Sequence, residues 1–220
     1  MSQINCTRKG CKDVFNAFLV NNADYEGFLE IPKIEYGVYR PTKLISFSKA
    51  IRSNDFECWV HFYEDDIAFE RLWRNPQKYF QILNKFAGVI CPDFSLYRDM
   101  PLVMQFWNIY RSRAIGHWLQ KNHINVIPNL RFGDERTTDV TCYGIAKHTA
   151  IAIGSYGTLK NKIDRKVFVN GLKSVISRIE PTIIIVYGSA PVSIFDEYRM
   201  QGIEIYQFDS EFAISRKGVV

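Results

Sequence analysis

The sequence predicts an α/β fold with a mostly parallel sheet, and two observations support this prediction. Short apolar runs of strand length alternate with amphipathic stretches of helix length, as at 87–93, 99–121 and 124–134. In the second half of the chain, strands begin about 25 to 35 residues apart, which is the length of one strand–helix unit. We therefore expect about seven strands in an irregular or incomplete (β/α) barrel, with a doubly wound open sheet as the alternative.

The first 40 residues are the least regular part of the chain. A short helix is expected at 13–19, but Asn21, Gly27 and Pro32 interrupt the segment that follows it. This composition indicates an N-terminal arm or lid at 1–40, ahead of a single α/β domain at 41–220. The 220 residues are enough for one domain with a substantial core.

Each element of the α/β domain has its own sequence signal. The run 57–63 alternates between two faces, as a strand does. Only about nine residues separate it from the strand expected at 43–47, too few for a helical crossover, so a regular eight-unit barrel is disfavoured. Asn75 and Pro76 are typical of a helix start, and so is Asp99. The further expected elements are helices at 67–74, 76–85, 99–121, 164–179 and 195–200, strands at 87–91, 124–130, 149–153, 182–187 and 203–208, and a loop at 133–139.

Composition and charge are those of an ordinary soluble globular protein. Hydrophobic residues make up 47% of the chain and charged residues 23%, and no apolar run reaches the roughly 20 residues that a membrane span needs. The first residues lack the features of a secretory signal, so we expect a cytoplasmic protein with no membrane partner. The net charge of +5 permits contact with nucleic acid or another polyanion without requiring it.

The cysteines and histidines do not form a recognisable site. The five cysteines are Cys6, Cys11, Cys58, Cys91 and Cys142. Their number is odd and their spacing is not that of zinc ligands, so we interpret them as reduced, small hydrophobic residues. The four histidines show no ligand spacing either, and no catalytic triad is indicated.

Polar residues end the two strands that flank the long helix expected at 99–121. Asp93 follows the first of these strands, whereas Asn129, Arg131 and Asp134 lie at the end of the second. In a parallel pair joined by a helical crossover, both carboxyl ends lie at the same edge of the sheet, which is where ligands bind in α/β folds. We therefore expect these four side chains to converge.

Asp66, Asp93 and Asp134 are the candidate catalytic residues, because each stands just beyond a predicted strand. Crowded carboxylates raise each other's pKa, which suits general acid or base chemistry, and they can also hold a divalent metal ion. No pattern identifies any other cofactor. Asp66 has the alternative of being an ordinary helix cap. Arg98 and Arg131 are the candidate basic ligands, because a guanidinium can clamp a phosphate; the alternative for Arg131 is an ion pair with one of these aspartates.

Two turns that contain glycine follow later strands and complete the candidate ligand site. Small residues let the backbone approach a ligand, and free N–H groups can bind an anion. Neither turn matches a P-loop, so tight turns without a ligand are the alternative. Four basic residues at 160–166 follow the first turn and would supply countercharge. The ligand-binding residues predicted from these turns are Gly154, Ser155, Tyr156, Gly157, Tyr187 and Gly188.

Several short motifs resemble those of a known family. They are CPDFSLYRDMP at 91–101, NIYRSR at 108–113, VIPNLRFGDER at 126–136 and IIVYGSAP at 184–191. Together they resemble the family known as domain of unknown function 4417, found in bacteria, phages and other mobile elements, over roughly 43–208. The resemblance implies a phage or mobile-element context, and it assigns no activity and no catalytic residue.

Two functions from different classes fit these residues. The first is an enzyme that acts on a nucleotide or a nucleic-acid phosphate, with Asp93 and Asp134 as acid, base or metal ligands and Arg131 on the phosphate. The alternative is a non-catalytic mobile-element protein that binds nucleic acid or a host protein. Strand-end carboxylates favour the enzyme, and distributed basic and aromatic residues favour the binding protein. The residues that favour the alternative are Arg71, Trp73, Arg74 and Lys78.

Overall fold

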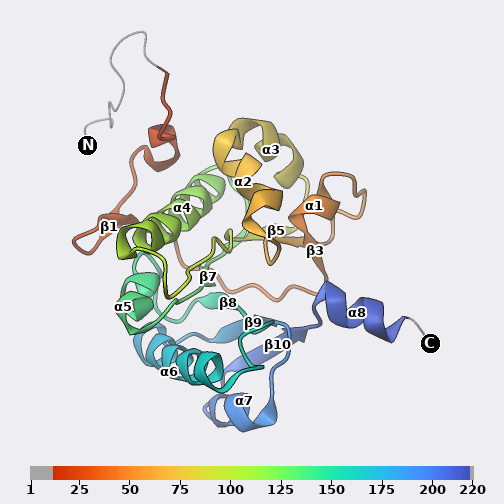
Figure 1. Cartoon of the computed structure of the whole chain (residues 1–220). Helices are drawn as coiled ribbons and strands as arrows, with labels where there is room; N and C mark the ends of the chain where they lie inside the picture. The colour runs from red at the N-terminus through yellow and green to blue at the C-terminus, as the bar shows by residue number, and fades with distance from the viewer. Residues whose placement is uncertain (1–11, 219–220) are drawn as a thin grey trace.

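The computed structural model describes residues 12–218, and two four-stranded parallel sheets form their centre (Figure 1). The strand order is β3, β4, β5, β6 in the first sheet and β7, β8, β9, β10 in the second. Within each sheet, every strand after the first therefore pairs with the strand that precedes it along the chain, and every pair is parallel. The strands are β3 (Leu44–Ser46), β4 (Trp59–His61), β5 (Gly88–Ile90), β6 (Val126–Ile127), β7 (Asn129–Leu130), β8 (Ala150–Gly154), β9 (Ile183–Tyr187) and β10 (Glu204–Phe208).

Helices connect most successive strands, and they begin at residues suited to start a helix. Asn75 accepts a hydrogen bond from the backbone N–H of Lys78, and Pro76 occupies the first turn, where its missing N–H is not needed. Asn161 caps another helix through the N–H of Asp164. Within residues 12–218, every helix is too short or too polar to span a bilayer. The helices are α1 (Phe47–Ala50), α2 (Asp66–Arg74), α3 (Pro76–Leu83), α4 (Leu102–Lys121), α5 (Glu135–Thr138), α6 (Lys162–Ile179), α7 (Val192–Met200) and α8 (Glu211–Lys217), with 3-10 turns η1 (Ala17–Val20) and η2 (Val140–Cys142) and a small hairpin of β1 (Tyr25–Glu26) and β2 (Ile31–Pro32).

The two sheets meet at Pro128, which separates the last residue of β6 from the first residue of β7. Ile127 pairs with Ile90 of β5, whereas Asn129 pairs with Ala152 of β8. Proline has no N–H to donate to a ladder, so one short stretch of chain leaves the first sheet and enters the second. The parallel pairing of neighbouring strands is confirmed, but the expectation of one continuous sheet is wrong because of this break.

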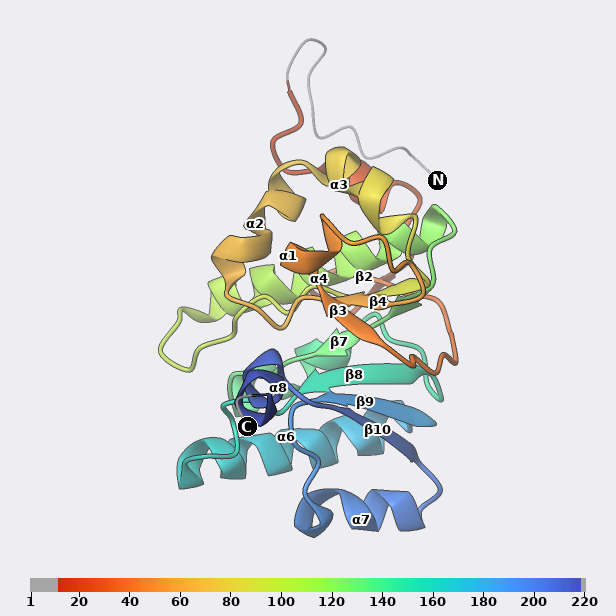
Figure 2. The same ribbon diagram turned by 90° about the vertical axis from the view of Figure 1, so that its right-hand side faces the viewer.

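Three clusters of buried side chains pack against the two sheets. One lies between the first sheet and α2–α4, and another between the second sheet and α6 and α7; Figure 2 shows the strands between these two groups of helices. The third fills the space between the inner faces of the two sheets, and its buried members are Trp59, Ile90, Ile127, Ala150, Ala152, Ile183 and Ile185. The α/β class is therefore confirmed. The described strands form no closed barrel, because β3 and β10 do not pair, and their order lacks the reversal that defines a doubly wound sheet.

Three local predictions are wrong. The short helix expected at 13–19 is replaced by the 3-10 turn η1 at Ala17–Val20. The long helix α4 begins at Leu102 rather than at Asp99, because Met100 precedes Pro101 and a residue that precedes a proline is steered away from helical geometry. The expected loop at 133–139 contains α5, in which Asp134 caps the helix and the side chain of Thr137 bonds back to the cap residue.

The described part of the N-terminal arm lies against α4 and the start of β8. The ring nitrogen Nδ1 of His117 on α4 lies 2.8 Å from the carbonyl oxygen of Lys33. The carbonyl oxygen of Gly37 accepts a hydrogen bond from the N–H of Ala150 at 2.8 Å. These contacts lie at the amino-terminal end of β8, opposite to the carboxyl ends of the strands. The division into an arm at 1–40 and one domain at 41–220 stays a prediction.

Three of the cysteines can be placed. Cys58, Cys91 and Cys142 are buried and free, which agrees with their interpretation as small hydrophobic residues. Burial raises the pKa of Cys91 to about 11, so its thiol is protonated at neutral pH. Cys6 and Cys11 lie outside the described residues.

Candidate functional site

A cleft with a volume of about 990 Å³ opens at the carboxyl ends of the strands. This is the edge at which ligands bind in α/β folds, and the size is that of a small-molecule site. Seven of the twelve residues predicted from the sequence line the cleft. They are Asp93, Arg98, Arg131, Gly154, Tyr156, Gly157 and Tyr187. These residues share one concave surface, and their roles in function stay predictions.

Asp93 is a buried member of this lining, with only 6% of its surface exposed. One carboxylate oxygen accepts a hydrogen bond from Nδ2 of Asn129 at 2.7 Å, and the other accepts one from Nη1 of Arg131 at 2.5 Å. Burial raises the pKa of Asp93, because the charged form loses its hydration, while Arg131 and Asn129 act in the opposite direction. A carboxyl group with a raised pKa exchanges a proton closer to neutral pH, as an acid or base requires.

Tyr63 extends this group of hydrogen-bonded side chains. Its hydroxyl donates to Oδ1 of Asn129 at 2.9 Å, which leaves Nδ2 of the same amide to donate to Asp93. Its ring stacks on Tyr187 with the centroids 4.6 Å apart, and the ring of His61 lies 4.5 Å from that of Tyr187. Burial raises the pKa of Tyr63 and lowers the pKa of His61 to about 4. Both side chains are therefore neutral at pH 7.

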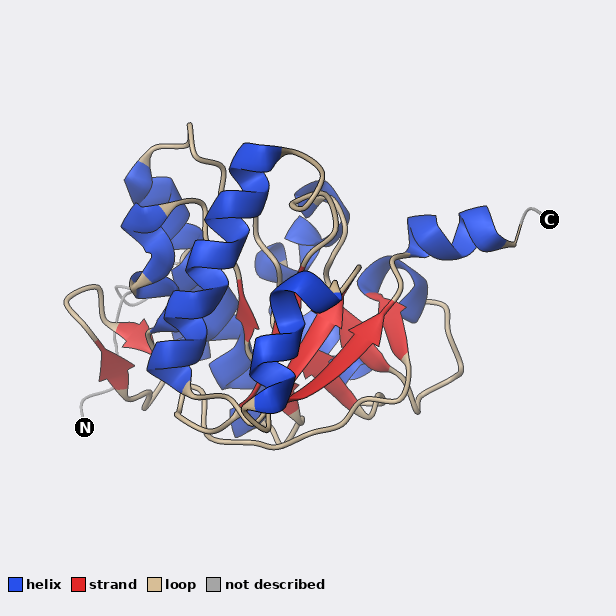
Figure 3. Ribbon diagram, turned by 90° about the horizontal axis from the view of Figure 1, so that it is seen from below, coloured by secondary structure: helices blue, strands red, loops and turns tan. Residues whose placement is uncertain are grey.

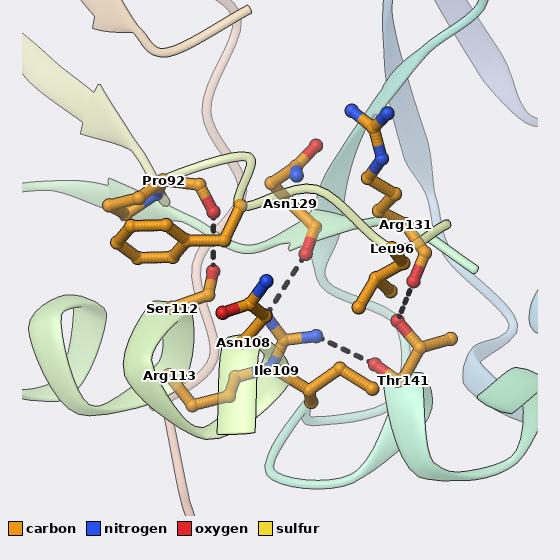
Figure 4. Close-up of a pocket in the computed structure, with 10 residues that line it drawn as sticks. Pro92, Leu96, Asn108, Ile109, Ser112, Arg113, Asn129, Arg131 and Thr141 are labelled. Atoms are coloured by element: carbon orange, nitrogen blue, oxygen red, sulfur yellow. Dashed lines mark hydrogen bonds between the residues drawn. The ribbon is translucent and has the colours of Figure 1, made fainter. Parts of the chain in front are cut away.

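A buried arginine of α4 holds the end of β7 in place. Arg113 is 1% exposed, and its guanidinium donates to the carbonyl oxygens of Asn129 at 3.0 Å, Thr141 at 2.6 Å and Tyr143 at 3.2 Å. The hydroxyl of Thr141 donates to the carbonyl oxygen of Arg131 at 2.7 Å. Figure 4 shows that the Arg131 side chain points away from these buried groups. The fixed backbone therefore directs the side chains of Asn129 and Arg131.

Two of the predicted catalytic carboxylates do not line the cleft. Asp66 accepts hydrogen bonds from the backbone N–H of Ser95 at 3.2 Å and from its hydroxyl at 2.9 Å, which ties α2 to the loop after β5. Asp134 caps α5 and accepts from the N–H of Arg136 at 2.9 Å. The guanidinium of Arg136 bonds the same carboxylate and lowers the pKa of Asp134. Both carboxylates are thus engaged in local contacts.

Arg98 lies on one wall of the cleft and joins three segments of the chain. Its guanidinium forms an ion pair with Asp164 of α6 at 2.6 Å, and both side chains are partly exposed. Its carbonyl oxygen accepts a hydrogen bond from Arg136 at 2.9 Å. The loop after β5 is therefore tied to α6 and to α5, and Arg98 already has an acidic partner.

The two glycine-containing turns differ in what they present to the cleft. Tyr156 and Gly157 line it, whereas Ser155 is 2% exposed and its hydroxyl donates to the carbonyl oxygen of Ser189 at 2.7 Å. Gly188 has a φ of +114°, and a Cβ at that position would lie 2.6 Å from Oγ of Ser155. Ser155 and Gly188 therefore allow the two turns to pack closely, while the first turn carries Tyr156 to the surface.

Sequence reasoning missed several residues of this region, among them His61, Tyr63, Glu211 and Phe212. His61 and Tyr63 had a signal, because the alternation at 57–63 places both on one face at the end of β4. Glu211 and Phe212 begin α8, a seven-residue helix that follows β10 after a short break. A helix this short has too few positions to show a periodic pattern.

The charge of the lining is acidic although the chain as a whole is basic. Six carboxylate side chains and two arginines line the cleft, and the net charge of the chain is +5. The arginines, Arg98 and Arg131, are paired with Asp164 and Asp93. Among residues 12–218, no group of three or more His, Cys, Asp or Glu side chains is arranged to hold a metal ion.

Comparisons with known proteins point to phages. A family model described as “Domain of unknown function (DUF4417)” matches residues 23–209. The “Gene 1 protein” of Mycobacterium phage L5 is 32% identical over 186 residues, which cover 83% of this chain and 80% of that protein. The “Gene 1 protein” of Mycobacterium phage D29 is 32% identical over 163 residues, which cover 72% of this chain and 60% of that protein. No solved structure matches the chain.

Proposed function

The chain belongs to the family described as “Domain of unknown function (DUF4417)” and is similar to phage proteins, and from the geometry of its cleft we propose that it is an enzyme that acts on a nucleotide or nucleic-acid phosphate. One observation carries the proposal. The buried carboxylate of Asp93 and the guanidinium of Arg131 meet at 2.5 Å in a cleft at the carboxyl ends of the strands. An acid–base group thus stands beside a group that binds phosphate.

In this proposal Arg131 binds the phosphate and Asp93 exchanges the proton. The Arg131 side chain is 37% exposed, and only its Nη1 is bonded to Asp93, so the remaining N–H donors of the guanidinium suit a phosphate oxygen. Asn129 and Tyr63 act as positioning residues. Their hydrogen bonds hold one oxygen of Asp93 while the other meets Arg131.

The acidic lining favours a nucleotide over a nucleic acid. A polyanion that gains affinity by releasing counterions needs an excess of Lys and Arg, and the cleft has the opposite balance. Mg²⁺ is commonly held by one or two carboxylates together with the phosphates of a substrate. We propose that the nucleotide enters as its magnesium complex, in which the metal offsets the carboxylates that remain unpaired.

The test is calorimetric titration of common nucleotides with and without Mg²⁺, for the wild type and for Arg131→Ala. We expect binding that depends on Mg²⁺ and an affinity at least about tenfold lower for Arg131→Ala, because a charge-assisted bond to phosphate is lost. Arg199→Ala is the matched control, since Arg199 is an exposed arginine paired with Asp196 on α7. Binding that is equal in all three proteins would refute the assignment of Arg131.

A second candidate function, a nucleic-acid-binding protein, has support from a different surface. The exposed faces of α2 and α3 carry Arg71, Arg74 and Lys78, and Lys85 follows directly. Trp73, the aromatic residue that we expected on this surface, is buried instead and packs edge-to-face against Trp107. A surface with several exposed basic side chains suits contact with a phosphate backbone.

Titration of single-stranded and double-stranded DNA at two salt concentrations separates this candidate from the first. A contact through α2 and α3 should weaken steeply with salt and should be reduced by Arg74→Glu combined with Lys78→Glu. Arg131→Ala should leave that contact unchanged. If DNA and nucleotides both fail to bind, a protein partner from the host becomes the leading candidate.

We also propose that the two sheets are the halves of one incomplete (β/α) barrel. Three features support this: the sequential strand order, the shared segment around Pro128 and the apolar cluster between the inner faces. The barrel would be open between β3 and β10, and ion pairs cross that opening. Arg40 pairs with Glu204 of β10, and Lys49 of α1 pairs with Glu211 of α8.

A further inference from the structure

Two half-exposed aromatic rings line the mouth of the cleft. Tyr156 follows β8 and is 49% exposed, and Phe212 follows β10 and is 47% exposed. Their ring centroids lie 6.1 Å apart with the planes at 53°. Rings of this size stabilise a fold most when they are buried, so two of them facing one cleft mark a surface that a flat ligand can cover.

A positively charged side chain lies over each of the two rings. The Nζ of Lys160 lies 5.7 Å from the centroid of Tyr156, and the guanidinium carbon of Arg216 lies 4.4 Å from the centroid of Phe212. These cations lie beside the cleft rather than in its lining. They therefore supply, at the mouth, the positive potential that the acidic walls lack.

The first turn of α8, which carries Phe212, is anchored to the body of the protein although the helix extends outwards. Figure 3 shows α8 extending away from the two sheets. Its first turn is anchored, because the N–H of Glu211 donates to the hydroxyl of Tyr187 at 3.1 Å and the Glu211 carboxylate pairs with Lys49 at 2.9 Å. The side chain of Ser210 caps the helix. Two contacts of Glu211 with the body of the protein thus place the neighbouring Phe212 at the mouth of the cleft.

The rings and Arg131 are separated along the edge of the second sheet. Arg131 follows β7, Tyr156 follows the neighbouring strand β8, and Phe212 follows β10, the outermost strand. With strands roughly 4.8 Å apart, the rings lie about 5 to 15 Å along the edge from the phosphate-binding residue. A ligand that reaches both must carry a flat group at one end and a phosphate at the other.

We propose that Tyr156 and Phe212 form a base-stacking subsite, so that the ligand of the cleft is a nucleotide and not a sugar phosphate or another phosphate ester. This inference rests on the proposed function, because the phosphate end of the ligand is assigned to Arg131. Stacking on aromatic rings is a general way to hold a nucleobase, since every base presents a π-face. The subsite adds affinity without selecting among the bases.

The test compares ligands that have a base with ligands that lack one. ATP, GTP, inorganic tripolyphosphate and ribose 5-phosphate are titrated in the presence of Mg²⁺ into the wild type, Tyr156→Ala and Phe212→Ala. We expect each variant to bind both nucleotides about tenfold or more weakly, and to bind tripolyphosphate as the wild type does. Phe28→Ala is the matched control, because Phe28 is 77% exposed and does not line the cleft.

Failure of this inference differs from failure of the proposed function. If the nucleotides bind and Arg131→Ala weakens them, but Tyr156→Ala and Phe212→Ala bind them as the wild type does, the base-stacking subsite is refuted and the phosphate site stands. If ribose 5-phosphate binds as tightly as ATP, the subsite is refuted as well. If none of the four ligands binds the wild type, both proposals fall.

Discussion

The carboxylate of Asp93 is buried, and burial disfavours its charged form. We predict that Asp93→Asn keeps its melting temperature within about 5 °C of the wild type, since the variant removes a buried charge and the half-exposed Arg131 can be solvated by water. We also predict that it loses at least about tenfold in ligand affinity or in activity. Thermal unfolding and ligand titration are measured on the same samples. A variant that melts many degrees lower and binds normally would show that Asp93 is structural.

The buried imidazole of His61 leads to a separate prediction, about how stability depends on pH. Its pKa in the folded protein is about 4 against an ordinary value of 6.5, so the unfolded chain takes up a proton before the folded protein does. The stability that comes from the neutral imidazole is fully present above pH 6.5 and is lost as the pH falls through 4. The expected loss is about 3 kcal/mol in the free energy of unfolding.

The measurement is urea unfolding between pH 4 and 7.5, for the wild type and for His61→Asn. Asparagine cannot be protonated, and its side-chain oxygen can accept the hydrogen bond that the N–H of Tyr63 now gives to Nδ1 of His61. The variant should be less stable at pH 7.5, and its stability should fall less steeply below pH 6.5. Equal pH dependence in both proteins would show that His61 does not cause the effect.

At the scale of single elements, α4 shows how packing can override helix propensity. Gly116 lies in the middle of this helix, where alanine would favour the helix by about 1 kcal/mol. An added Cβ would lie 2.5 Å from Sγ of Cys91 and 2.7 Å from Cδ1 of Ile34, and such overpacking costs about 1–3 kcal/mol. We predict that Gly116→Ala is destabilising by about 1 kcal/mol, because the cost of overpacking exceeds the gain in helix propensity.

Denaturant unfolding tests this prediction through the midpoint at an unchanged m-value. Val103→Ala on the exposed side of the same helix is the control, because Val103 is 73% exposed and only propensity changes there. The control should be neutral or slightly stabilising. If Gly116→Ala were stabilising too, Ile34 and the arm that carries it would have to be loosely packed against α4.

The elements themselves were predictable to the extent that their signals were local. Asn75 with Pro76 gave a correct helix start, and continuous apolar runs gave β8 and β9. The start of α4 was wrong because the cap signal of Asp99 competed with Pro101, and α5 was missed because its cap looked like loop composition. Short elements that depend on capping are beyond what periodicity can show.

Only the part of the site that lies at the ends of neighbouring strands was predictable from the sequence. Convergence of Asp93, Asn129 and Arg131 follows from parallel pairing, and the three side chains do bond to one another. The partners that determine their chemistry come from elsewhere in the chain. Arg113 reaches the strand end from α4, and Tyr63 reaches it from β4 through a different sheet. Sequence spacing contains no information about such contacts.

For the whole molecule, the cluster between the two sheets predicts a single cooperative unfolding transition. Its members come from both sheets, so loss of either sheet would expose the inner face of the other. All four tryptophans lie between positions 59 and 118, so their fluorescence reports on the first half of the chain, whereas circular dichroism reports on both halves. The two transitions should coincide. Separate midpoints would divide the predicted domain at 41–220 into two folding units.

The sequential strand order also determines which part of the protein can fold first during its synthesis. Each sheet is built from strands in the order in which they leave the ribosome, so the first sheet and its outer helices can assemble before the second sheet exists. The inner face of that first sheet, with Trp59, Ile90 and Ile127, has no cover until β8 and β9 are synthesised. Between residues 127 and 187 about 60 residues must be added, which takes about 3 to 12 seconds at ordinary rates of translation. During that interval the nascent chain presents an apolar surface to chaperones, and a chain that ends near Pro128 should aggregate.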